Sequence, residues 1–240
     1  MDRLLQDIRK YWGRRAPSFS DNINQEDPDR WMDVIEQEIP VSENCRVLDI
    51  GTGPGFFAVA LAKRGYDVTA VDLTPEMLEQ AKKNAGPLAE KIHFLPMDAE
   101  HLDFPDNYFD VLVTRNLTWN LEHPDQAYAE WFRVMRPGGT LLNFDANWYR
   151  YLYQDDHHAA EHIEKANLRV YDDSETMENI ARKLCLSKID RPLFDLALLD
   201  KIGFSRVTAD KNIWKKVWSE EQKRENRFTP CFMIKACKEA

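Results

Sequence analysis

Three glycines at alternate positions, Gly51, Gly53 and Gly55, directly follow a short apolar run at residues 45–50. The apolar run predicts a buried strand, because it is short and a glycine loop ends it. Glycine lets the backbone turn tightly and lie against a ligand with no Cβ in the way. Tight turns and close-packed helix starts also use glycine, so the loop alone leaves its role open.

Short apolar runs and helical patterns alternate from residue 45 to residue 144. Five strands are predicted, at residues 45–50, 67–71, 92–95, 108–114 and 140–144, with helices between the strands except between the third and fourth. Strands and helices joined by short loops predict a parallel sheet that is covered on both faces. A helix at 193–202 and two further strands, at 203–210 and 230–238, complete the pattern.

The flanking segments are predicted to elaborate one domain that spans residues 1–240. A chain of this length is sufficient for a single well-buried core. Residues 1–40 hold two predicted helices, at 2–12 and from Pro28 to before Pro40, separated by a polar loop at 16–28. Residues 147–192, and 147–200 with the helix that follows, are predicted as a helical insertion above the ligand-binding edge. The polar stretch 211–227 is predicted as a solvated connection.

Acidic residues follow the second and third predicted strands. The loop spacing is GxGxG after Asp49, not the GxGxxG of dinucleotide-binding folds. Asp72 ends the second strand, where a carboxylate could accept hydrogen bonds from both ribose hydroxyls. Asp98 and Ala99 follow the third strand, where a carboxylate and a backbone N–H could contact an adenine ring.

Four segments in order, VLDIGTGPG, VTAVDLTPEML, MDAEHLDFPDNYFD and EHPDQAYAEWFRVMRPGG, resemble the class I S-adenosylmethionine (SAM)-dependent methyltransferases. The resemblance is greatest to the type 11 group, which includes quinone-biosynthesis enzymes, and it covers about residues 45–145. It implies SAM as cofactor and transfer of a methyl group. It also implies an α/β, Rossmann-like, seven-stranded, mostly parallel sheet with an antiparallel last strand, to which we add the helical lid or insertion after the fifth strand.

The resemblance also implies positions for the cofactor-binding residues. Asp49, Gly51 and Gly53 correspond to the methionine part, Asp72 to the ribose, Leu73, Asp98 and Ala99 to the adenine, Arg115 and Asn116 to the sulfonium, and Tyr11 and Trp12 to an aromatic pair over the cofactor. Two simpler interpretations stay open. Asp49 could only cap the loop, and Tyr11 and Trp12 could only pack the helix onto the core.

Methyl transfer mainly requires alignment of the two reactants, so a general base is needed only when the acceptor arrives protonated. Candidate bases are His123, His157 and His158, with His162 close by, although a surface or packing histidine is the favoured interpretation of any single one. The run at 155–162 could place two histidines and an acid on one helix face. Its spacing matches no dedicated metal site, and a solvated helix start is the favoured interpretation, so no metal is predicted.

Composition limits the partners. A net charge of −9 argues against nucleic acid and anionic membranes, and four scattered cysteines with no apolar spanning run or leader indicate the cytoplasm. Aromatic residues after the fourth and fifth strands could line an apolar pocket for a small-molecule acceptor, which the sequence does not name. The oligomeric state, monomer or homodimer, stays open.

Two alternatives to a methyltransferase remain. One is a SAM-binding regulatory or scaffold protein without turnover, and the other is an NAD-dependent oxidoreductase, which the GxGxG spacing disfavours.

Overall fold

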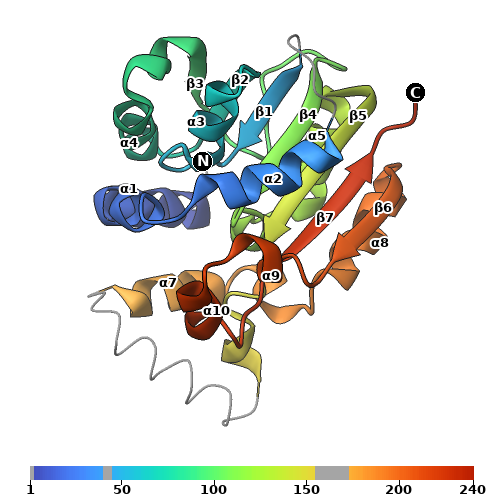
Figure 1. Ribbon diagram of the computed structural model, residues 1–240. Coiled ribbons are helices and arrows are strands. Elements are labelled where there is room, and N and C mark those ends of the chain that lie inside the picture. The colour runs from blue at the N-terminus through green and yellow to red at the C-terminus, as the bar shows by residue number, and fades with distance from the viewer. Residues whose placement is uncertain (1–2, 40–44, 155–172) are drawn as a thin grey trace.

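The computed structural model describes residues 3–39, 45–154 and 173–240, and Figure 1 shows a central sheet with helices on both faces. The sheet has seven strands in the order β3-β2-β1-β4-β5-β7-β6. The strands are β1 (Arg46–Ile50), β2 (Asp67–Asp72), β3 (Ile92–Pro96), β4 (Phe109–Arg115), β5 (Met135–Asp145), β6 (Ser205–Asp210) and β7 (Phe232–Cys237).

Strands β1 to β5 pair in parallel, whereas β7 runs antiparallel to both β5 and β6. The predicted seven-stranded, mostly parallel sheet with an antiparallel last strand is therefore confirmed. The strand order reverses beside β1, where β2 leads to one edge and β4 to the other. In open α/β sheets, ligands bind outside the carboxyl ends of the strands at such a reversal.

The helices of the described residues lie before, between and after the strands. They are α1 (Arg3–Ile23), α2 (Pro28–Glu38), α3 (Phe56–Lys63), α4 (Pro75–Ala85), α5 (Pro124–Val134), α7 (Ser174–Ala181), α8 (Leu193–Ile202), α9 (Trp214–Val217) and α10 (Glu220–Glu225). Short 3-10 turns are η1 (Gly86–Lys91), η2 (Thr118–Asn120), η3 (Arg150–Tyr153) and η4 (Cys185–Lys188). None of these helices combines the length and apolar character that crossing a membrane requires.

Alternate residues of the central strands enter opposite cores. In β1, Val47 packs with α2, α3 and α9 on one face, and Leu48 packs with α5 and α8 on the other. In β4, Val111 and Leu112 divide between the faces in the same way. This alternation follows from the two-residue period of a strand, and both faces are apolar because both are covered.

Two predicted loops are partly helical. The prediction of a polar loop at 16–28 is wrong over its first half, because α1 continues to Ile23 with Pro17 inside it. Ala16, Ser20 and Ile23 are buried on one side of this extension, and Ser20 Oγ accepts a hydrogen bond from Asn84 of α4. The prediction of a solvated connection at 211–227 is also wrong in part. Ile213, Val217 and Trp218, in and beside α9, are buried in the core.

The described parts of the region after β5 contain three helical elements, η3, α7 and η4, joined by turns. The inner faces of this region and of α1 form a third apolar cluster together with η2. Its buried members are Ile8, Tyr11, Trp119, Met177, Ile180 and Leu184. The segment 155–172 lies outside the described residues.

Candidate active site

The loop after β1 has a conformation that its glycines permit. Gly51, Gly53 and Gly55 have φ angles of 66°, 55° and 87°, in the left-handed region that residues with side chains rarely adopt. A Cβ on Gly51 would lie 2.8 Å from the side chain of Leu117, in the segment after β4. The absence of a side chain therefore lets the loop pack against this segment.

Asp49 lies beneath the glycine loop, near the carboxyl end of β1. Its Oδ2 accepts hydrogen bonds from Thr52 Oγ1 at 2.6 Å and from the Ala58 backbone N–H at 3.0 Å. Burial raises the pKa of Asp49 to about 7, although both hydrogen bonds act to lower it. Asp49 therefore caps the loop, as the simpler interpretation expects, and it also lines the cavity described below.

Asp72 joins the end of β2 to the same loop. Its Oδ2 accepts from the Gly53 N–H and its Oδ1 from the Thr74 N–H, each at 2.8 Å. Burial raises the pKa of Asp72, and these backbone hydrogen bonds act to lower it. Each carboxylate oxygen can accept more than one hydrogen bond, so Asp72 positions the loop and keeps acceptor capacity for a ligand.

The turn after β3 is fixed by its own hydrogen bonds. Asp98 Oδ1 accepts from the Glu100 N–H at 2.9 Å, and the Ala99 carbonyl accepts from Trp131 Nε1 at 2.9 Å. The second contact joins the turn to α5, and Asp98, Ala99 and Glu100 lie along one wall of the cavity.

The side chain of Arg115, at the end of β4, is enclosed by an acidic residue and two aromatic rings. Its Nη2 lies 2.6 Å from Glu26 Oε1, and its guanidinium lies 4.5 Å and 4.3 Å from the ring centres of Trp31 and Phe56. Arg115 Nη1 and Glu26 Oε2 are buried and have no hydrogen-bond partner among the described residues. One donor and one acceptor of this ion pair therefore stay unused.

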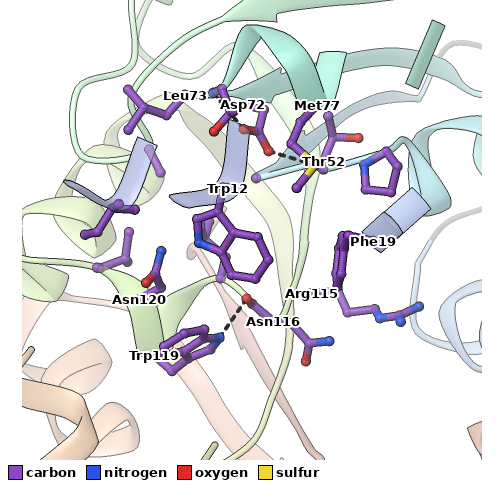
Figure 2. Close-up of a pocket in the computed structure, with 18 of the residues that line it drawn as sticks. Trp12, Phe19, Thr52, Asp72, Leu73, Met77, Arg115, Asn116, Trp119 and Asn120 are labelled. Carbon is purple, nitrogen blue, oxygen red and sulfur yellow. Dashed lines mark hydrogen bonds between the residues drawn. The ribbon is translucent and has the colours of Figure 1, made fainter. Parts of the chain in front are cut away.

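These groups surround a cavity of about 390 Å³ at the carboxyl edge of the sheet (Figure 2). This volume lies within the usual range for small-molecule sites, about 300–1,000 Å³. The structure brings together ten of the eleven residues that the sequence assigned to the cofactor. They are Trp12, Asp49, Gly51, Gly53, Asp72, Leu73, Asp98, Ala99, Arg115 and Asn116.

Tyr11, the eleventh residue, does not line the cavity. It is 7% exposed and belongs to the apolar cluster between α1 and α7. Its ring meets Trp12 edge to face, with the ring centres 5.3 Å apart. Tyr11 therefore packs behind the wall that Trp12 presents.

Aromatic side chains form the other side of the cavity. Trp119 lies 6.5 Å from Trp12 and 4.9 Å from Tyr149, measured between ring centres. Asn116 joins two of the tryptophans, because its carbonyl accepts from Trp119 Nε1 at 2.9 Å and its Oδ1 from Trp148 Nε1 at 3.3 Å. The cavity thus has an acidic, glycine-rich half and an aromatic half.

The candidate histidines are not brought into this cavity in the described residues. His123 is exposed at the start of α5, and its backbone N–H donates to Glu100 Oε1 at 2.8 Å. It lies in an adjoining surface depression with His101 and Glu122, and this depression shares Asp98 and Glu100 with the cavity. His157, His158 and His162 lie outside the described residues. Within the described ranges, no group of three or more His, Cys, Asp or Glu residues could hold a metal ion.

The sequence did not identify several residues of the lining. Phe19 and Ile23 come from the stretch that was predicted to be a loop, and that interpretation hid them. Leu117 and Asn120 lie in the segment after β4. Their place beyond a parallel strand was the available signal, because such segments meet at the ligand-binding edge.

A buried polar network beneath the aromatic half was also missed. Arg191 donates to Asp145 Oδ2 at 2.7 Å, to both oxygens of Asp195 at 2.8 Å and to Thr118 Oγ1 at 2.8 Å. Asp145 Oδ2 also accepts from the hydroxyl of Thr118 and, at 2.8 Å, from the Trp119 N–H. The network therefore ties the segment before α8 to η2, which carries Trp119.

The fold and the site together define a class of protein. A left-handed glycine loop, an acid at the end of β2 and a second acid after β3 surround one cavity, beside the point where the strand order reverses. This arrangement suits a nucleoside with an amino-acid tail, and it is that of the class I SAM-dependent methyltransferases.

Comparison with known sequences agrees with this class. Residues 48–143 match the family described as "Methyltransferase domain". A demethylmenaquinone methyltransferase of Deinococcus radiodurans is 39% identical over 114 residues, which cover 47% of this chain and 47% of the relative. The chain spans about half the length of the curated relatives it matches. Residues 48–143 thus form a methyltransferase domain of the SAM-dependent class I, and the relatives that align with it include enzymes named for quinone methylation.

Solved structures share the fold at low identity. Phosphoethanolamine N-methyltransferase 2 of Haemonchus contortus, in complex with S-adenosylhomocysteine, has a TM-score of 0.63 at 15% identity and covers 87% of this chain and 52% of its own. The [4+2]-cyclase SpnF has a TM-score of 0.67 at 16% identity, and the match covers 98% of this chain and 97% of the SpnF chain. These likenesses concern the fold alone, and one fold can host different reactions.

Proposed function

We propose that the protein transfers a methyl group from SAM to a small-molecule acceptor. The observation that carries this proposal is the division of one cavity into an acidic, glycine-rich half and an aromatic half. The first half offers partners for a nucleoside and an amino acid. The second offers apolar walls for an acceptor next to it.

In the nucleoside part of the proposed site, Asp72 accepts hydrogen bonds from the ribose hydroxyls. Leu73, Asp98 and Ala99 contact the adenine. The spare acceptor capacity of Asp72 and the position of Asp98 along the same wall support these roles.

In the methionine part, Asp49, Gly51 and Gly53 lie along the chain of the amino acid. Arg115 and Asn116 lie at its far side. Arg115 lines the cavity, and its Nη1 has no partner among the described residues, so it fits a group that carries a carboxylate. A buried charged donor without a partner is costly, and such a ligand would supply one.

When bound, SAM would supply a methyl carbon on a positively charged sulfur. An acceptor lone pair would bond to that carbon as the carbon–sulfur bond breaks, so that the positive charge passes to the acceptor and S-adenosylhomocysteine leaves. The protein contributes alignment and exclusion of water, which can supply much of the rate. The rings of Trp12, Trp119 and Tyr149 are placed to do both.

The names of the relatives support a small molecule as acceptor, since they include demethylmenaquinone methyltransferases. The net charge of −9 disfavours nucleic acid as the substrate.

The four cysteines are all free, which fits a reducing compartment, and we propose the cytoplasm. We also propose that residues 1–240 act as one domain, in which residues 1–40 and 147–200 cover the site.

Calorimetry with SAM, S-adenosylhomocysteine, NAD and NADP tests the proposed cofactor. The two sulfur compounds should bind in the micromolar range, and the two nicotinamides should not bind. Binding of NAD without binding of SAM would refute the assignment. Production of S-adenosylhomocysteine from SAM with candidate quinols then tests turnover, and binding with no turnover on any acceptor would favour a regulatory protein.

A further inference from the structure

The segment after β4 places one polar side chain on the aromatic side of the cavity. Asn120 is the last residue of η2, and its backbone N–H donates to the Leu117 carbonyl at 2.9 Å. It lines the same cavity as Trp12 and Trp119. Figure 2 shows its amide on the side of the cavity where these two rings lie.

The side-chain oxygen of Asn120 is unused in the described structure. The residue is 9% exposed, and its Oδ1 is buried with no hydrogen-bond partner. Neighbouring polar groups in η2 differ in this respect. The Thr118 hydroxyl and the Trp119 N–H both reach Asp145, and Trp119 Nε1 donates to Asn116. Because buried polar groups are normally paired, an orphaned carbonyl in a cavity wall points to a ligand that supplies the missing donor.

The Arg191 network fixes the turn that carries this side chain. Asp145 accepts from both residues that precede Asn120 in η2, and it is itself paired with Arg191. The amide therefore extends from a turn whose other polar groups are fixed. A site that is fixed in this way can discriminate between ligands by one hydrogen bond.

We propose that Asn120 determines which acceptors the site admits. Its Oδ1 accepts a hydrogen bond from an N–H or O–H group on an otherwise apolar, ring-containing molecule. An amide oxygen orients such a group without removing its proton, so Asn120 directs a nitrogen or oxygen lone pair toward the methyl group. The positive charge passes to the methylated atom, which then releases its proton to water. This inference rests on the proposed function, because it assumes that SAM fills the other half of the cavity.

The test compares phenol with toluene, which differ by one hydroxyl group, on protein saturated with S-adenosylhomocysteine. The ratio of their dissociation constants is measured by calorimetry or ligand-observed NMR for the wild type and for Asn120→Leu. Comparing the ratios between proteins cancels the different hydration of the two probes. Asn212→Leu, in an exposed turn before α9, is the matched control.

The preference for phenol should fall by roughly five- to tenfold in Asn120→Leu, the effect of one hydrogen bond of about 1–1.4 kcal/mol. It should not change in Asn212→Leu. Asn120→Leu should bind S-adenosylhomocysteine as the wild type does. It should also fold normally, since it removes an unpaired buried carbonyl. Asn120→Ala should show the same loss and serves as the second variant.

Three results would overturn the inference. They are an unchanged phenol-to-toluene ratio in both Asn120 variants, no binding of phenol to the saturated wild type, and a loss of S-adenosylhomocysteine affinity in Asn120→Leu. The last would assign Asn120 to the cofactor. Failure of the wild type to bind S-adenosylhomocysteine at all would instead refute the proposed function, so the two failures can be distinguished.

Discussion

Arg191 Nη1 lies 2.7 Å from Asp145 Oδ2, and neither side chain has any exposed surface. Burial acts to lower the pKa of Arg191, but the carboxylates of Asp145 and Asp195 raise it well above its ordinary value. The guanidinium therefore stays charged inside the protein. Because Asp145 also accepts from the Trp119 N–H, this ion pair supports the aromatic side of the cavity.

Arg191→Met should destabilise the protein by about 3–5 kcal/mol, because it leaves two buried carboxylates without their cation. Arg182→Met is the control, since Arg182 is half-exposed and its distance to Glu178 is 3.9 Å. That variant should change the free energy of unfolding by less than about 1 kcal/mol. Denaturant unfolding measures both. Equal stability of the two variants would show that the network does not stabilise the fold.

Asp72→Ala should weaken SAM binding by about 1–3 kcal/mol or more, because the ribose hydroxyls lose a charged acceptor. The glycine loop also loses a contact, since Asp72 accepts from the Gly53 N–H. Asp67→Ala, at the exposed start of the same strand, should bind SAM normally. Calorimetry measures the affinities, and thermal unfolding should show that Asp72→Ala still folds. Wild-type affinity in Asp72→Ala would contradict the assigned role.

Arg115→Met should reduce discrimination between S-adenosylhomocysteine and 5′-methylthioadenosine, which lacks the amino-acid part. The wild type should prefer the former because Arg115 Nη1 is free to bind a carboxylate. Loss of a charged hydrogen bond of about 1.5–3 kcal/mol corresponds to roughly 10- to 100-fold in the affinity ratio. Arg224→Met, on the exposed helix α10, is the control. The assignment fails if Arg115→Met keeps the wild-type ratio.

Asp49→Asn should alter how stability depends on pH. Burial raises the pKa of Asp49 from 3.8 to about 7, so the folded protein holds a proton there that the unfolded chain releases near pH 4. Wild-type stability relative to Asp49→Asn should therefore fall as pH rises from about 4 to 7 and level off above, a change on the order of a few kcal/mol. Melting temperatures of both proteins from pH 4 to 9 test this. A difference that is independent of pH would mean that Asp49 is ionised in the fold.

Much of the acidic, glycine-rich half of the cavity could be predicted from local sequence. The positions of Gly51, Gly53 and Asp72 follow from the ends of predicted strands, and in a parallel sheet those ends meet at one edge. The aromatic half was predicted only as a group of residues after β4 and β5. The prediction for α1 was wrong beyond residue 15, where a loop was expected and the helix continues. The polar sequence there includes small buried residues, Ala16 and Ser20, on the side that packs on α4.

The sequence by itself determined the alternation of strands and helices, the glycine loop and the acids that follow β2 and β3. These features depend on residues within a few positions of one another, where periodicity and spacing are direct signals. Only the tertiary structure decided that Phe19 would reach the cavity, that Asn120 would line it with its side-chain oxygen unpaired, and that Arg191 would meet Asp145. Those two partners are 46 residues apart in the chain. A charged residue between apolar segments carries no local sign of its partner, because burial and pairing depend on how distant elements pack.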